Sequence, residues 1–359
     1  MARRRRRHWW LWAVFIVLVV AIAVASRVNL NYYAIQPGVA QSVQQFITVP
    51  AHRSHSVHHP VLLTDVEIGR VTALSYLFFK LQSDTDLESV SSVVGPLPPS
   101  QLIAEGNLEM SQAEAAAKTA ALTRLGYHVT ASAAGAVIFG TFAGTPAAST
   151  LQVGDVITAV DGTPVTSAKD LTQVLDHYHS GQAITMSVRR GGNGPPRPVP
   201  VTLRATRVDL GFGQYTTLNL GIEPEDQVDY RYPFPVNINV TNIGGPSAGL
   251  AMTLGVMDAL TDGSITGGHT VAATGTIAAD GDVGAVGGVA QKTVAVENAG
   301  ASIFLVPKGD GNYGAALSKD RPGLKVYAVT TLNQALAVLA AHGGHIPAVP
   351  VSAPVAAGG

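Results

Sequence analysis

The pattern of apolar and polar positions is clearest in the second half of the chain. Residues 236–240 alternate between apolar and polar side chains, as a half-buried strand does. A glycine-rich turn follows at 244–249, and residues 247–260 are then apolar on nearly every side, which predicts a buried helix. Ser247 is therefore expected at a strand–turn–helix junction, where free backbone N–H groups favour negative charge and can hold an oxyanion.

A second glycine-rich turn, at Gly287 and Gly288, precedes a second predicted helix that carries Lys292. Val289 and Val296 recur at helical spacing, and Gly300 is a suitable residue to end the helix. A serine needs a base before it can act as a nucleophile. A lysine in an apolar, buried site has a lowered pKa and can serve as that base near neutral pH.

The middle of the chain has the pattern of a small β-rich domain. Residues 136–139 and 184–188 are strand-like, and turns are expected at 144–147 and at Asp161-Gly162. A helix with one apolar face is expected to begin at Ser167.

The N-terminus combines a basic segment with an apolar one. Arg3 to Arg7 precede an uncharged run from Trp9 to Ala25 that is at the short end for a membrane-spanning helix. The positive charges predict that the arginines stay in the cytoplasm and that the rest of the chain is extracytoplasmic. We therefore expect a single-pass plasma-membrane protein with a retained anchor. A cleaved signal peptide is the alternative, because Ala23-Val24-Ala25 has the A-x-A form.

Residues 28–123 are less informative. A strand is expected at 61–66, and Ser111 to Glu114 form a capping box that predicts a helix from there to Leu125. Four histidines between 52 and 59 are interpreted as a solvated loop rather than a metal site, since no acidic or cysteine ligand completes a known spacing. The Pro- and Gly-rich residues 343–359 are expected to form a flexible tail.

Composition excludes several classes of protein. Of 359 residues, 47% are hydrophobic and 13% charged, so folded cores are expected rather than disorder. The formal net charge of −1 gives no basic field for nucleic acid. Without cysteine there is no disulfide and no thiolate chemistry. No phosphate-binding G-x-x-x-x-G-K-[ST] loop occurs, so no nucleotide, and no other cofactor or metal, is expected.

Three ordered blocks resemble the proteolytic domain of Lon proteases: residues 245–249, residues 274–277, and residues 281–292. The resemblance implies that Ser247 is the nucleophile and Lys292 the general base, with Thr274 near the lysine. Gly245, Ala248 and Thr274 would then support the site and its oxyanion. Gly244 and Thr276 stand where the family often has acidic residues. The family's ATPase module has no counterpart here, and the resemblance also implies a homo-oligomeric ring.

Residues 124–206 resemble a PDZ domain of the bacterial protease type, through Gly154-Asp155-Val156-Ile157 and Asp161-Gly162. Such domains bind the C-terminus of an extended peptide beside a strand. Leu125, Gly126 and Tyr127 are candidates for the loop that captures the carboxylate. They equally fit the end of the preceding helix, with Gly126 just beyond its last turn.

The sequence thus predicts an α+β protein in five parts: cytoplasmic arginines and a membrane helix at 1–27, an N-terminal extracytoplasmic region at 28–123, a PDZ-like domain at 124–206, a Lon-like proteolytic domain at 207–342, and the tail. The predicted function is that of a membrane-anchored, ATP-independent serine endopeptidase acting on proteins or peptides. A catalytically silent PDZ scaffold is the main alternative. An α/β-hydrolase with Ser247, Asp310 and His342 or His345 is a further one, because 245–249 also has the G-x-S-x-G form.

Overall fold

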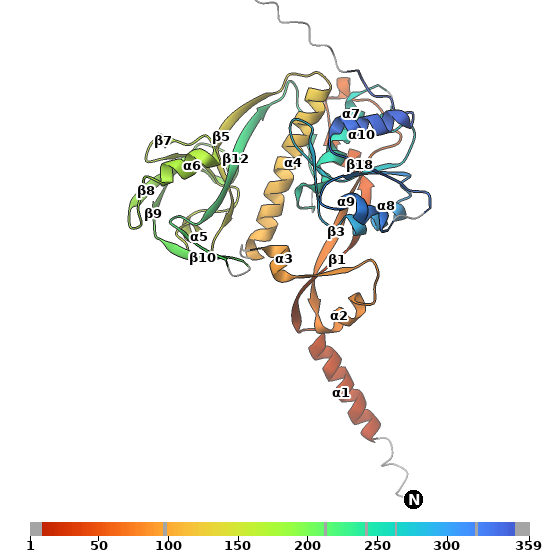
Figure 1. Ribbon diagram of the computed structural model, residues 1–359, viewed down its shortest axis with the longest axis horizontal. Helices are drawn as coiled ribbons and strands as arrows, with labels where there is room; N and C mark the ends of the chain where they lie inside the picture. Colours follow the sequence, from red (N-terminus) through yellow and green to blue (C-terminus); the bar gives the residue numbers. More distant parts are fainter. Residues whose placement is uncertain are drawn as a thin grey trace, which may run out of the picture.

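Two six-stranded β-sheets divide the protein into two parts that are bridged by a long helix (Figure 1). The computed structural model describes residues 9–95, 99–211, 214–240, 243–262, 264–319 and 322–348. The five arginines and the end of the predicted tail lie outside the described residues. The described fold is α+β, as the sequence predicts.

The larger sheet is built from both ends of the chain. Its strand order is β18-β17-β14-β3-β1-β4. The first three are mutually parallel and β14 pairs in parallel with β3, whereas β1 is antiparallel to β3 and β4. Residues 28–95 therefore supply half of this sheet. The strands are β1 (Asn29–Ser42), β3 (Leu62–Thr72), β4 (Asp86–Ser89), β14 (Val271–Ala273), β17 (Ile303–Pro307) and β18 (Lys325–Val329).

Helices cover both faces of this sheet. One face packs on α4 (Leu102–Arg124), α7 (Gly249–Leu260) and α10 (Leu332–Ala341), which share the largest apolar core. The other face packs on α8 (Val289–Asn298) and α9 (Asn312–Leu317) around Phe304. Helix α7 is buried along its whole length, because it lies between the sheet and α4. Between these elements lie η2 (Val43–Phe46), β2 (Ile47–Thr48), η3 (Ala51–Arg53), α3 (Val90–Val94), η4 (Pro99–Gln101), β13 (Asn237–Ile238), η6 (Pro246–Ala248), β15 (Thr276–Ile277) and β16 (Val283–Gly284).

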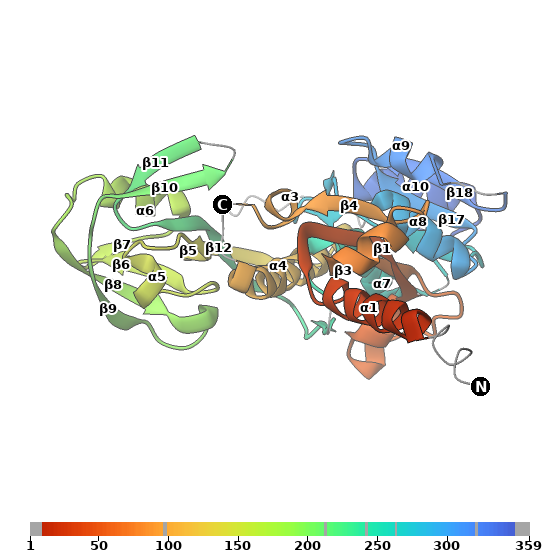
Figure 2. The ribbon, with the colours of Figure 1, turned by 90° about the horizontal axis from the view of Figure 1, so that it is seen from below.

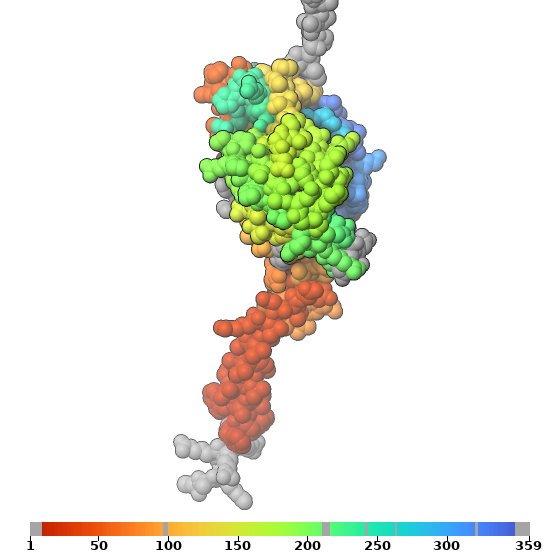
Figure 3. Space-filling view, turned by 90° about the vertical axis from the view of Figure 1, so that its left-hand side faces the viewer, coloured from red at the N-terminus to blue at the C-terminus, as the bar shows by residue number. Residues whose placement is uncertain are grey.

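The second part is a small β-rich domain, which faces the viewer in Figure 3 and is seen beside the larger part in Figure 2. Its sheet has the order β12-β5-β6-β8-β9, with β7 beside β6, and its core is separate from that of the larger part. Its elements are β5 (Thr130–Thr141), α5 (Ala147–Thr150), β6 (Val156–Val160), β7 (Thr163–Pro164), α6 (Ala168–Leu175), β8 (Ala183–Arg189), η5 (Arg190–Gly192), β9 (Arg197–Thr202), the hairpin β10 (Thr206–Gly211) and β11 (Gln214–Leu218), and β12 (Ile222–Arg231).

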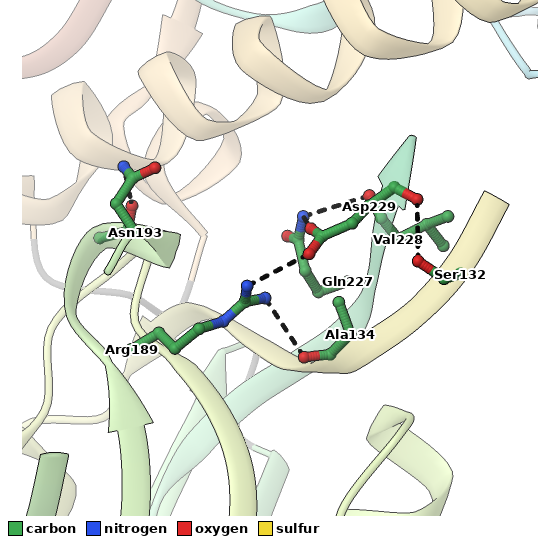
Figure 4. Close-up of polar contacts among 8 residues, drawn as sticks. Ser132, Ala134, Arg189, Asn193, Gln227, Val228 and Asp229 are labelled. Atoms are coloured by element: carbon green, nitrogen blue, oxygen red, sulfur yellow. Dashed lines mark hydrogen bonds and ion pairs between the residues drawn. The ribbon is translucent and has the colours of Figure 1, made fainter. Parts of the chain in front are cut away.

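Strand β12 belongs to this second sheet, although its residues were expected in the proteolytic part. It pairs with β5 from Ile222 to Arg231. Arg189, at the end of β8, fixes the pairing further. Its guanidinium donates to Asp229 at 3.2 Å and to the carbonyl of Ala134 at 3.3 Å (Figure 4). The chain therefore leaves the small domain only after residue 231, shortly before the turn that carries Ser247.

Helix α1 (Trp9–Ala25) projects from the larger part (Figure 1). None of its residues is buried. Among the described residues, no helix has both the length and the apolar character needed to cross a bilayer. The end of α1 leads directly to β1, and the short helix α2 (Ala73–Phe79) lies beside that junction.

Candidate active site

The turn before α7 positions Ser247. Gly245 has a positive φ of 87°, which favours glycine, and the chain then enters the single turn η6. Ser247 lies in the middle of η6 and is half-buried, while Ala248 is buried at the start of α7. The predicted strand–turn–helix junction is confirmed, although the strand before it is limited to Asn237–Ile238.

Lys292 lies one turn into α8 and is buried, with 2% of its surface exposed. Gly288 precedes the helix in the left-handed region, at φ 68°. A Cβ at Gly288 would lie 2.7 Å from Val66 Cγ1, so the glycine lets α8 approach β3 closely. Because burial disfavours the charged ammonium, it lowers the pKa of Lys292 to about 8. The carboxylate of Asp65 on β3 acts in the opposite direction and keeps the pKa from falling further.

Thr274 connects these two residues. Its buried hydroxyl donates to the carbonyl oxygen of Ser247 at 3.2 Å and accepts from Lys292 Nζ at 3.4 Å. The backbone N–H of Gly275 donates to the same Ser247 carbonyl at 2.9 Å. The three sequence blocks thus come together in one site. There the hydroxyl of Thr274 binds both the buried amine of Lys292 and the backbone carbonyl of the half-buried Ser247.

Helix α4 forms one wall of the site, which the sequence did not indicate. The N–H of Gly245 donates to the carbonyl of Gly106 at 2.9 Å, so this donor is already engaged rather than directed toward an oxyanion. The two backbones lie close together: a Cβ on Gly106 would be in ordinary van der Waals contact with the Cα of Gly244, at 3.6 Å. Gly106 precedes the helix predicted from Ser111, so the sequence carried no signal of this contact.

Asp65 is a second residue that sequence reasoning missed. Its Oδ1 accepts from the N–H of Val39 at 2.7 Å, at a β-bulge in β1. Gly38 has no room for a Cβ there, because Asp65 Oδ1 occupies that space. The carboxylate is therefore held in place by β1 while its charge acts on Lys292.

Residues 125–127 follow the last turn of α4 and cap it, as one of the two interpretations expects, while the carboxylate-loop hypothesis for them stays a prediction. Gly126 has φ 82°, and its N–H and that of Tyr127 bond back to Thr123 and Leu122. Leu125 and Tyr127 pack on the core of the larger part, not on the small domain.

The small domain has its pocket elsewhere. A cavity of about 250 Å³ lies between α6 and the segment that enters β12, and its lining includes Leu171, Leu175, Leu220, Gly221 and Ile222. Strand β12 is also an edge strand of its sheet. Leu220 and Gly221 directly precede this edge strand, which begins at Ile222.

The histidines needed for an α/β-hydrolase lie at the wrong end of α7. His342 Nε2 is 3.0 Å from Tyr327 Oη, and its Nδ1 bonds to the carbonyl of Val338. The N–H of His345 bonds to Ser264, which follows the C-terminus of α7. Since α7 has 12 residues, these groups are separated from Ser247 by roughly 18 Å of helix. The hydrolase alternative is therefore wrong.

Among the described residues, no three His, Asp or Glu side chains gather closely enough to hold a metal ion.

Two segments of the chain match families of protein domains. Residues 228–341 match the Lon protease (S16) C-terminal proteolytic domain, and residues 123–195 match the PDZ domain. Lon protease 2 of Bacillus subtilis (strain 168) is 35% identical over 117 residues, covering 33% of this chain and 20% of that protein. Lon protease of Malacoplasma penetrans (strain HF-2) is 32% identical over 115 residues, covering 30% and 14%.

A shorter match reaches higher identity: Lon protease of Clostridioides difficile (strain 630) is 47% identical over 64 residues, covering 18% of this chain and 8% of that protein. The chain thus spans a fifth or less of the length of these relatives. Two segments of the chain are thus similar to known domains, one to the proteolytic domain of Lon (S16) proteases and the other to the PDZ domain.

Proposed function

We propose that this chain is an endopeptidase that uses Ser247 as nucleophile and Lys292 as general base, and that it cleaves peptides without hydrolysing ATP. The main support for the proposal is that the hydroxyl of Thr274 binds both the buried amine of Lys292 and the backbone carbonyl of Ser247. Such a link would hold the two residues in one geometry, as a two-residue mechanism requires.

The chemistry follows from the neutral form of the lysine. Neutral Lys292 accepts the proton of Ser247 Oγ as that oxygen attacks the scissile carbonyl. The resulting ammonium then gives the proton to the leaving amine as the C–N bond breaks, leaving an acyl ester on Ser247. Water, deprotonated by the same amine, hydrolyses this ester and regenerates the serine.

Burial makes this mechanism feasible near neutral pH. With a pKa of about 8, roughly a tenth of Lys292 is neutral at pH 7. An ordinary lysine, with a pKa near 10.4, would be neutral in only about 0.04% of molecules. The apolar surroundings of α8 thus raise the population of the active base by more than about two orders of magnitude.

Substrate selection is proposed for the PDZ domain. A peptide would add to the free edge of β12, with its C-terminus near Gly221 and its side chains beside Leu171 and Leu175. From the far end of β12 the chain continues to the turn that carries Ser247, so the groove and the nucleophile lie on neighbouring segments of the chain.

Membrane attachment is also proposed, through α1. Its 17 residues are all apolar, and none of them is buried against the protein. Such a helix is costly to expose to water, and a bilayer offers it an apolar surrounding. Together with the five arginines, it favours a protein whose body is extracytoplasmic at the plasma membrane. A homo-oligomeric ring remains a proposal that rests on the Lon resemblance alone.

The test compares two variants with matched controls. Ser247→Ala and Lys292→Arg should each lower kcat on an unstructured peptide by about 10² or more, because the arginine stays protonated and cannot act as a base. The exposed Ser318 and Lys308 provide controls, as Ser318→Ala and Lys308→Arg. Circular dichroism would check that all four variants fold.

Labelling by a fluorophosphonate probe distinguishes the proposal from the scaffold alternative. A peptidase should be labelled at Ser247, and the label should be absent in Ser247→Ala. A folded wild-type protein that neither cleaves peptides nor takes up the probe, yet binds peptides through its PDZ domain, would instead support a catalytically silent scaffold.

A further inference from the structure

Helix α2 exposes large apolar side chains on the surface of the larger part. Leu77 is 67% exposed and Leu81, just beyond the helix, is 88% exposed. Leu74 and Phe78 are exposed as well. We call these four residues the α2 patch. Grouped exposed apolar side chains on one short segment indicate an interaction surface rather than the scattered apolar residues of an ordinary surface.

The backbone holds the α2 patch next to α1. The N–H of Ala73, the first residue of α2, donates to the carbonyl of Val28 at 2.9 Å, and Val28 follows α1 by three residues. Thr72 and Ser75 close a capping box at the start of α2, which fixes its direction. The patch therefore lies at the end of the molecule from which α1 projects (Figure 1).

Aromatic and basic side chains surround the α2 patch. The rings of Tyr32 and Tyr76 are 5.6 Å apart, and Lys80 Nζ lies 5.7 Å from the centre of the Tyr76 ring. Arg70 lies 5.5 Å from the centre of the Tyr33 ring, on β1. Tyrosines with neighbouring cations suit the interface of a bilayer, where rings lie among headgroups and cations meet lipid phosphates.

Basic side chains lie on the elements that lead to and from the α2 patch. Arg70 is exposed on β3, the strand that continues into α2, and Lys80 is exposed at the end of α2. Arg27, two residues beyond α1, is exposed as well. Glu88 on β4 pairs with the same Tyr33 as Arg70 and faces the same side of the sheet, and Asp84, near Leu81, pairs with Lys319 at 3.0 Å. The exposed cations on these segments are those that would meet lipid phosphates.

We propose that the α2 patch lies in the interface of an anionic lipid bilayer, as a second membrane contact beside α1. This inference rests on the membrane attachment proposed above. A single helix leaves the attached body free to tilt and rotate about it. A second contact fixes the larger sheet relative to the bilayer, and with it the distance from the membrane at which Ser247 can act.

Site-directed spin labels test this placement. Because the chain has no cysteine, single substitutions can be labelled specifically in the full-length protein. Labels at Leu77→Cys and Leu81→Cys report on the patch, Leu18→Cys on α1, and Lys169→Cys on an exposed position of α6, in the small domain away from α1. Accessibility to oxygen and to a water-soluble nickel chelate would be measured in vesicles of phosphatidylglycerol and phosphatidylcholine.

The expected result is that labels at 18, 77 and 81 favour oxygen, while the label at 169 favours the nickel chelate. Patch labels that behave like the one at 169, with the label at 18 in lipid, would overturn the patch but leave membrane attachment standing. An aqueous label at 18 would refute attachment and the patch together. Spin–spin broadening at 77 would assign the patch to contact between two copies and would overturn the lipid proposal.

A second experiment varies the charge of the lipid. Replacing Arg70 and Lys80 by glutamine should reduce the oxygen preference at 77 and 81 in phosphatidylglycerol vesicles toward that in pure phosphatidylcholine. If the double variant and the wild type respond equally to lipid charge, the basic residues do not contact the headgroups, and the proposed anionic partner is wrong.

Discussion

Replacing Asp65 by asparagine should make the proposed peptidase more active at neutral pH. The Asp65 carboxylate raises the pKa of Lys292 against the larger effect of burial. Removing its charge should therefore lower this pKa below about 8 and increase the neutral fraction of the amine. Asparagine keeps an oxygen that can accept from the N–H of Val39, so the bulge in β1 should persist.

The size of the effect is bounded by the neutral fraction. With a pKa of about 8, roughly 9% of Lys292 is neutral at pH 7, so kcat/KM there can rise by at most about tenfold. A fall of one pKa unit would give about fivefold. At high pH the lysine is neutral in both proteins, and their plateaus should coincide.

The assay is the pH dependence of kcat/KM for one peptide, which reports groups of the free enzyme. Glu67→Gln is the matched control, because Glu67 is an exposed carboxylate on the same strand. We expect the pH at which kcat/KM rises to be lower in Asp65→Asn than in the wild type, and to be unchanged in the control. A rise that does not move, or moves to higher pH in a protein that remains folded, would refute this account of the site.

Thr274→Val should lower kcat about 10- to 100-fold, because the buried hydroxyl that joins Lys292 to Ser247 is lost. Steady-state kinetics would measure the loss of kcat, and circular dichroism should show little change in secondary structure. Gly288→Ala should lower the melting temperature and activity together, since its left-handed φ costs roughly 1–2 kcal/mol and Val66 leaves no room. Lys292→Met should be more stable than wild type below about pH 8, where the wild type buries a charge. The pKa of Lys292 is lower in the folded protein than in the unfolded chain, so between about pH 8 and about pH 10.4 only the unfolded chain holds the proton. The free energy of unfolding of the wild type should therefore rise by about 3 kcal/mol across this pH range, as measured by denaturant titrations.

Local structure around the site could be predicted because local residues determine it. Glycine-rich turns ahead of apolar runs predicted the helices that carry Ser247 and Lys292, and both are confirmed as η6–α7 and α8. Ser167 likewise caps α6, accepting from the N–H of Asp170. In each case, an N-terminal cap or a left-handed glycine lies within a few residues of the element it starts.

Features that depend on distant pairing could not be predicted. The helix expected from Ser111 in fact begins at Leu102, because helix-forming residues continue upstream of the capping box. That extra length brings Gly106 to the Ser247 turn. Periodicity likewise gave no sign that Asp65 would act on Lys292, since the contact arises only when β3 pairs with β14 and α8 packs on the same sheet.

The pairing of β3 with β14 also has a consequence for synthesis of the protein. Leu62 is opposite Ala272, so 209 residues must be added to the growing chain after Leu62 before its partner exists. The small domain, whose strands are contiguous in sequence from β5 to β12, can fold in the meantime. The buried surroundings of Lys292 come last. The segments of the proposed peptide groove are therefore complete before those around the proposed base.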